Sequence, residues 1–133
     1  MTCELCNSAG GDLVWQTALC RVVLVPDADY PGFCRVILNR HVKEMADLPE
    51  PERQALMHVV FAVEQTLTCL MQPDKINLAS LGNVVAHVHW HIIPRFTDDA
   101  HFPQPIWAAA TRTGSRRTAP DLQKLRNKLD EFV

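Results

Sequence analysis

The sequence lacks an excess of either charge. Its 133 residues include 13 Lys and Arg against 15 Asp and Glu, which gives a formal net charge of −2. A protein that binds nucleic acid through the phosphate backbone needs a basic surface, so this balance argues against a nucleic-acid partner. A local basic pocket for a small anion is compatible with it.

Long apolar stretches are also missing. No run approaches the ~18 consecutive apolar residues of a transmembrane helix, and the opening MTCELC has neither the basic region nor the apolar stretch of a signal peptide. We therefore expect a cytoplasmic protein with no membrane partner. The sequence also has no internal repeat or low-complexity segment, and its length suits one domain.

The five cysteines do not form an even set, and without an export signal this argues against a disulfide framework. Cys20, Cys34 and Cys69 lie among apolar neighbours, as small core residues do. Cys3 and Cys6 differ from them, because their C-x-x-C spacing suits two ligands of a metal ion or a redox pair.

Strands precede and follow one long helix in the predicted order of elements. Apolar and β-branched runs predict strands over residues 13–16, 18–25, 33–38, 75–79 and 84–93. The turn-rich PDADYPG joins the second and third of these, which predicts an antiparallel hairpin. The sequence therefore predicts an α+β fold, an antiparallel sheet of about five strands with one long helix and a C-terminal helix.

Apolar spacing predicts the two helices. The first opens at Leu48, with Asp47 as its cap, and Pro73 ends it. Its apolar positions recur at i, i+3, i+4 and i+7; they are Leu56, Val59, Val60, Val63, Leu67, Leu70 and Met71. Residues 121–133 predict a polar amphipathic helix that docks through its leucines, and residues 106–110 predict one helical turn.

The most informative segment is VVAHVHWHII, the last predicted strand, which Pro94 ends. Alternate residues of a strand share a face, so His87, His89 and His91 line one side. The other side takes the spacers Val88, Trp90 and Ile92.

Three interpretations of this histidine face compete. One is a solvated polar face, although exposed strand faces normally carry Thr, Lys or Glu. Another is a three-histidine metal site, although three ligands on one extended strand point too nearly parallel to converge on one ion. The third is nucleophilic catalysis at phosphorus, in which one imidazole attacks while its neighbours orient it and carry protons.

A family resemblance favours the third interpretation. His-x-His-x-His with apolar spacers, followed by IIPR, resembles the signature of the histidine triad (HIT) superfamily of nucleotide hydrolases and transferases. GFCRVI followed by His41 is similar to that family's Gly-to-His strand, and the Pro-Arg ending is most like the dinucleoside polyphosphate hydrolase and bacterial branches. We take residues 1–110 as the HIT-like domain and 111–133 as a C-terminal extension of the same domain.

The resemblance implies a role for each histidine. His89 would be the nucleophile, which attacks the α-phosphate of a nucleoside phosphate derivative and forms a covalent nucleotidyl-histidine that water then cleaves. His91 would donate to phosphate oxygens, and its backbone carbonyl would accept the other ring N–H of His89 and so fix the tautomer. His87 completes the catalytic set.

It also implies a binding set for a purine nucleotide, either a dinucleoside polyphosphate or a phosphoramidate. Asn83 would donate to phosphate, Asn77 would contact ribose or the bridging phosphate side, and Gly82 would allow close backbone approach. Asp27 is the nearest match to the family's ribose-binding acid, with Asp29 as its rival. The resemblance further implies a homodimer with a continuous sheet.

The chain departs from the family's pattern at several positions. Leu78 stands where relatives commonly have Gly, Val84 replaces a hydroxyl that would bond phosphate, and Asn39-Arg40 replaces Pro-Lys. These departures keep a second function open: a nucleotide-binding regulatory module with little turnover. Turnover assays distinguish the two.

Cys3 and Cys6 supply half of a tetrahedral metal site. In several relatives the other two ligands match His41 and His87, and all four residues are present here. The resemblance thus implies a structural zinc, while the chemistry itself needs no metal. A redox pair and an unmetallated thiol pair are the alternatives.

Overall fold

The computed structural model describes residues 2–133. Five strands form one antiparallel sheet in the order β1-β2-β3-β5-β4. The strands are β1 (Asp12–Gln16), β2 (Cys20–Leu24), β3 (Cys34–Leu38), β4 (Lys75–Ala79) and β5 (His89–Arg95). The helices are α1 (Glu4–Asn7), the 3-10 helix η1 (Met45–Asp47), α2 (Glu50–Met71) and α3 (Leu122–Leu129). The predicted α+β class, the β2–β3 hairpin and both longer helices are confirmed.

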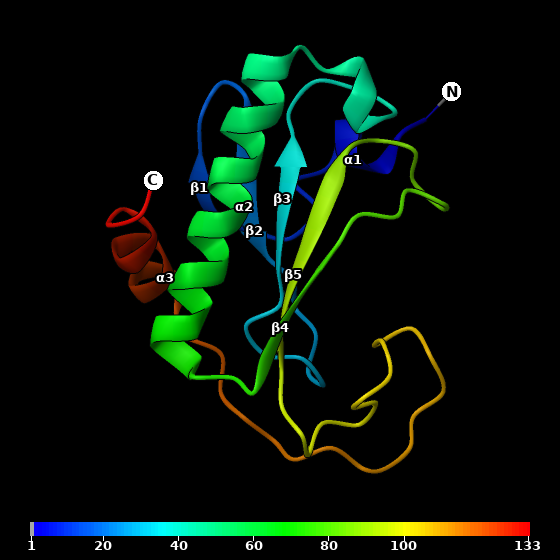
Figure 1. The fold of residues 1–133 in the computed structure, drawn as a ribbon, viewed down its shortest axis with the longest axis vertical. Coiled ribbons are helices and arrows are strands. Elements are labelled where there is room, and N and C mark those ends of the chain that lie inside the picture. The colour runs from blue at the N-terminus through cyan, green and yellow to red at the C-terminus, as the bar shows by residue number, and fades with distance from the viewer. Residues whose placement is uncertain (1) are drawn as a thin grey trace.

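The two faces of the sheet are covered differently (Figure 1). On one face, α2 packs against β3 and β5, and α3 packs against β1 and α2. The main core fills this layer, and its strand residues include Val14, Cys20, Val22, Cys34, Val36, Leu38 and Ile92. The opposite face is partly covered by α1 and by the loop that follows β5, and the histidines of β5 belong to that face.

The long helix α2 begins and ends at signals close to those expected. Its N-cap is Pro49, whereas Asp47 lies one turn earlier in η1, so the predicted Asp47 cap is wrong. Proline suits this end because the first N–H groups of a helix have no partner inside it. The helix closes at Gln72, whose φ of 48° is left-handed. By length and composition α2 could cross a bilayer, but here one face packs on the sheet as in a core helix.

The C-terminal segment docks on the helix layer. Asp121 caps α3 by accepting from the backbone N–H of Lys124 at 2.8 Å. Leu125 and Leu129 are buried in the main core, and Arg126 Nε donates to the carbonyl of Val14 at 2.8 Å. Residues 106–108 form a turn and a bend and residues 109–110 have no regular structure, so the predicted helical turn is wrong.

The last strand has different bounds from those predicted. It begins only at His89 and runs through Pro94 to Arg95. Proline is tolerated there because β3 pairs with β5 only as far as Ile92, so the proline has a sheet neighbour on one side alone. Before the strand, His87 lies in a tight turn, where its N–H donates to the carbonyl of Val85 at 2.9 Å.

Candidate active site and metal centre

Two of the three histidines share a pocket on the sheet face away from α2. His89 and His91 are 8% and 6% exposed, and their ring centroids lie 5.0 Å apart. The register pairs Arg35 of β3 directly with His91. Arg35 therefore lines the same pocket as the two rings, whose rim is formed by the loop that carries Gly82.

A backbone hydrogen bond fixes the tautomer of His89. Its Nδ1 lies 2.6 Å from the carbonyl oxygen of His87. A carbonyl can only accept, so Nδ1 carries the proton and Nε2 keeps a free lone pair. The predicted acceptor, the carbonyl of His91, is wrong. The His89 ring donates to an earlier residue because the chain turns just before β5 and brings the carbonyl of His87 to Nδ1.

His91 is held in the opposite tautomer. Arg35 Nε donates to its Nδ1 at 3.4 Å, which leaves the proton on Nε2. The rings of Phe33 and Trp107 meet it edge-on, with centroids 5.5 and 5.1 Å away. Burial, followed by the charges of His89 and Arg35, lowers the pKa of His91 to about 4. The ring is therefore neutral at pH 7 and offers one N–H donor.

The loop before the triad supplies part of the expected binding set. Gly82 has φ +81°, a backbone conformation that side chains with a Cβ rarely adopt. Gly82 and Asn83 both line the histidine pocket. The side chain of Val84 is 97% exposed, so it faces water.

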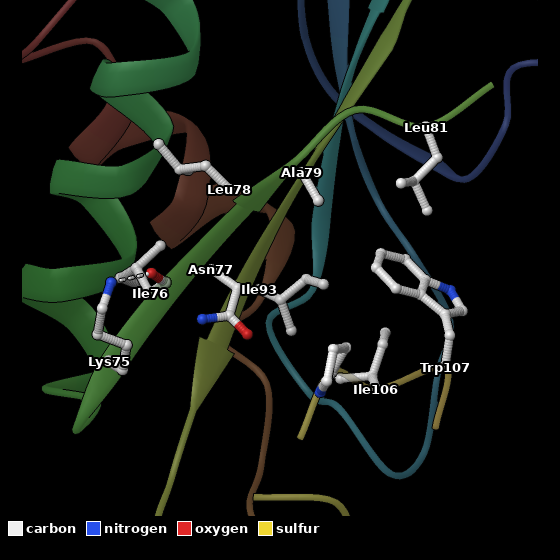
Figure 2. Close-up of a pocket in the computed structure, with 10 residues that line it drawn as sticks. Lys75, Ile76, Asn77, Leu78, Ala79, Leu81, Ile93, Ile106 and Trp107 are labelled. Atoms are coloured by element: carbon white, nitrogen blue, oxygen red, sulfur yellow. Dashed lines mark hydrogen bonds between the residues drawn. The ribbon is translucent and has the colours of Figure 1, made fainter. Parts of the chain in front are cut away.

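Asn77 lies apart from the histidine pocket. Its Oδ1 accepts from Arg95 Nη1 at 2.8 Å, and it lines a second, mostly apolar pocket along the edge strand β4. Figure 2 shows this pocket, with Asn77 and Ile93 from the sheet facing Ile106 and Trp107 from the loop after β5. Trp107 lines both pockets, so the two adjoin along its ring.

Asp27, the candidate ribose-binding acid, lies in the β2–β3 connection. Its Oδ1 accepts from the backbone N–H of Asp29 at 2.9 Å, and its charge acts on Arg35. Asp27 is half-buried whereas Asp29 is exposed, and neither acid lines the histidine pocket.

A buried ion pair fixes the loop that carries Trp107. Arg95, 1% exposed, donates from Nε and Nη2 to the two carboxylate oxygens of Asp99 at 2.8 and 3.0 Å. Burial by itself raises the pKa of Asp99, but Arg95 and the backbone N–H groups of Phe96, His101 and Phe102 outweigh it and hold that pKa below its usual range. The sequence shows only a polar loop here, so this pair was not predicted.

The third histidine of the triad belongs to a different cluster. Cys3, Cys6, His41 and His87 bring four ligand atoms within 4.8 Å of one another. His87 Nδ1 lies 3.4 Å from Cys3 Sγ and 3.5 Å from Cys6 Sγ, and His41 Nδ1 lies 3.4 Å from Cys6 Sγ. The sequence-predicted ligand set is thus brought together in space.

The donor chemistry of this cluster suits a metal ion. His87 Nε2 lies 2.6 Å from the carbonyl of Leu38, so the proton sits on Nε2 and the lone pair of Nδ1 points at the two sulfurs. A backbone carbonyl that orients a histidine ligand in this way is a common supporting contact at metal sites. Two thiols and two imidazoles form a tetrahedral set that soft divalent metals prefer.

The family model of the HIT domain matches residues 8–98. The chain belongs to the HIT family. Its fold is also that of solved HIT proteins: it is 31% identical to a histidine triad protein from Bradyrhizobium japonicum, with a TM-score of 0.72 over 91% of this chain and 90% of that one.

A second HIT structure, a histidine triad protein from Marinobacter aquaeolei VT8, is 26% identical with a TM-score of 0.79, and the match covers all (100%) of this chain and 98% of the other. A search of the curated proteins finds no match. Membership places this HIT protein in a superfamily of nucleotide-binding proteins, hydrolases and transferases.

Two residues of the HIT pocket were missed from the sequence. Trp107 carries no local signal, because its place beside His91 depends on the loop that Asp99 fixes. Arg35 does carry one: it is the single charge in the strand segment FCRVIL. Arg21 gives the same signal in its own strand but serves a structural purpose, since it donates to the carbonyls of Leu5, Ser8 and Ala9.

Proposed function

We propose that this HIT protein hydrolyses or transfers nucleotidyl groups at the α-phosphate of nucleoside phosphate derivatives. One observation carries the proposal. His89 donates its Nδ1–H to a backbone carbonyl, which leaves a free lone pair on Nε2, and the ring lines a pocket. A neutral imidazole of this kind is a good nucleophile near pH 7.

The reaction has two displacements. In the first, the Nε2 lone pair of His89 forms a bond to the α-phosphorus, and the bond from phosphorus to the leaving oxygen or nitrogen breaks with its electron pair, which takes up a proton from the solvent. In the second, water attacks the same phosphorus, loses a proton, and expels His89 with its lone pair restored. The Nε2–H of His91 and the amide of Asn83 donate to the phosphoryl oxygens as charge develops there.

A substrate panel tests this function. Wild-type protein should release adenosine monophosphate from diadenosine tetraphosphate or from a fluorogenic adenosine phosphoramidate without added divalent metal. The panel separates the two substrate classes by their relative kcat/KM. Nucleotide binding with no turnover of either compound contradicts the proposal and favours a regulatory binding module.

We also propose that the metal at Cys3, Cys6, His41 and His87 is zinc. Thiolate and imidazole ligands in a tetrahedral set are those of structural zinc sites. When bound, the ion would join α1 to the turn before β5, where Val85 packs against the same apolar cluster as Leu5. The four side chains would complete a tetrahedral set, so such an ion would stabilise the fold and leave the chemistry to the histidine pocket.

A homodimer is the proposed assembly, and the cytoplasm the proposed location. The outer edge of β4 has no strand beside it in the described sheet, and Phe61 of α2 is 49% exposed. An open sheet edge and an exposed apolar side chain each favour pairing with a second copy. We expect sedimentation at micromolar concentration to give twice the mass of one chain, and a single-chain mass would contradict the dimer.

A further inference from the structure

Of the three strand arginines in residues 2–133, Arg35 has neither a carboxylate partner nor a set of backbone carbonyls around its charge. Arg95 is paired with Asp99, and Arg21 is surrounded by backbone carbonyls. Arg35 donates only to His91 Nδ1 at 3.4 Å and to the carbonyl of Gly10 at 3.2 Å among the hydrogen bonds of residues 2–133. Within that part of the chain, no carboxylate lies within ion-pair distance of it.

The position of Arg35 is set by the sheet. Residues 33, 35 and 37 lie on the sheet face that carries the histidine pocket, since residues 34, 36 and 38 lie in the main core. The pairing of Arg35 with His91 puts the guanidinium beside both pocket histidines. The central carbon of the guanidinium lies over the ring of Phe33, 5.5 Å from the ring centroid.

A half-buried guanidinium without a counter-ion calls for an anionic ligand. Arginine stays charged in proteins, and its planar fork matches two oxygens of a phosphoryl group. The carboxylates of Glu4 and Asp27 act on Arg35 only through longer-range attraction. Its Nη2 donors are used by no hydrogen bond of the described residues and belong to a side chain that lines the pocket.

We infer that Arg35 is a further catalytic residue, which contacts non-bridging oxygens of the substrate's α-phosphoryl group and stabilises the charge that develops there. It also acts on His91: by donating to Nδ1, it keeps the His91 proton on Nε2, where a second donor is needed. Arg35 thus supplies cationic stabilisation in a pocket where the side chain of Val84 offers no hydrogen-bond donor. This inference rests on the proposed function.

The test compares Arg35→Met with wild type in turnover and in binding. We expect kcat to fall about 10²- to 10³-fold, the usual cost of one donor to a developing oxyanion. Wild type should bind adenosine monophosphate more tightly than adenosine, and Arg35→Met should lose that preference while its affinity for adenosine is unchanged. Arg53→Met, on the exposed side of α2, is the matched control and should match wild type.

Arg35→Lys keeps the charge but not the fork. It should retain the preference for the monophosphate and recover only part of kcat, and it serves as the test if Arg35→Met does not fold, as judged by its melting temperature. A preference for the monophosphate that survives in Arg35→Met, or an Arg35→Lys variant with full kcat, overturns the inference. If wild type turns over no substrate, the proposed function fails, while the binding comparison still judges the phosphate contact.

Discussion

Replacing His89 with alanine is expected to lower turnover by at least about three orders of magnitude, a typical cost of losing a catalytic nucleophile. The variant retains the guanidinium of Arg35 and the N–H donor of His91, so nucleotide binding should survive. A loss confined to kcat would mean that His89 acts in the transition state and not in binding. The decisive measurement is single-turnover kinetics beside equilibrium binding of adenosine monophosphate.

The covalent intermediate gives a second readout for the same variant. Wild-type protein mixed with substrate labelled at the α-phosphate should carry label that is released by acid and resists base, and His89→Ala should carry none. His58→Ala is the matched control, because His58 is exposed on α2 and remote from the pocket. Near-normal turnover in His89→Ala would show that the covalent mechanism at this residue is wrong.

The metal centre leads to the other large effect. Protein purified without chelators should contain about one zinc per chain. Removing the ion should lower the melting temperature by roughly 10 °C, because a structural site adds its binding free energy to the folded state. Metal analysis and calorimetry measure the two quantities. The affinity should fall in acid, since protons compete for the thiolates and imidazoles.

Cysteine variants test the same centre without a chelator. Cys3→Ser and Cys6→Ser should each lose the metal and melt lower. Cys69 is exposed on α2, so its predicted place in the core is wrong, and Cys69→Ser should keep both metal content and melting temperature. A wild-type protein that holds almost no metal, yet melts at the same temperature with and without chelator, would contradict the zinc assignment.

The elements of this fold could be predicted where one periodicity dominates. The β4 prediction matches its bounds, Lys75–Ala79, and α2 was found from its apolar spacing. The last strand was misjudged because VVAHVHWHII is uniformly β-prone, although its first half leaves the sheet. There the contacts of His87 with Leu38 and the cysteines, all distant in sequence, override the local preference.

The residues of the site could be predicted from the sequence, but most of their contacts could not. Cys3, Cys6, His41 and His87 meet as the resemblance implied. The partner of the His89 ring could not be predicted, since it depends on a turn of the backbone and not on a side chain. Arg35 was overlooked for a related reason: a charge in a strand has the same sequence signal whether it serves the fold or the chemistry.

His87 contributes to the two sites through different atoms, one set in its side chain and the other in its main chain. The ring of His87 is directed to the cysteines, while its carbonyl holds the proton of His89. The second contribution does not depend on which residue stands at position 87. A substitution at position 87 that keeps the turn should therefore leave the tautomer of His89 unchanged while it removes one of the four ligand atoms of the metal centre.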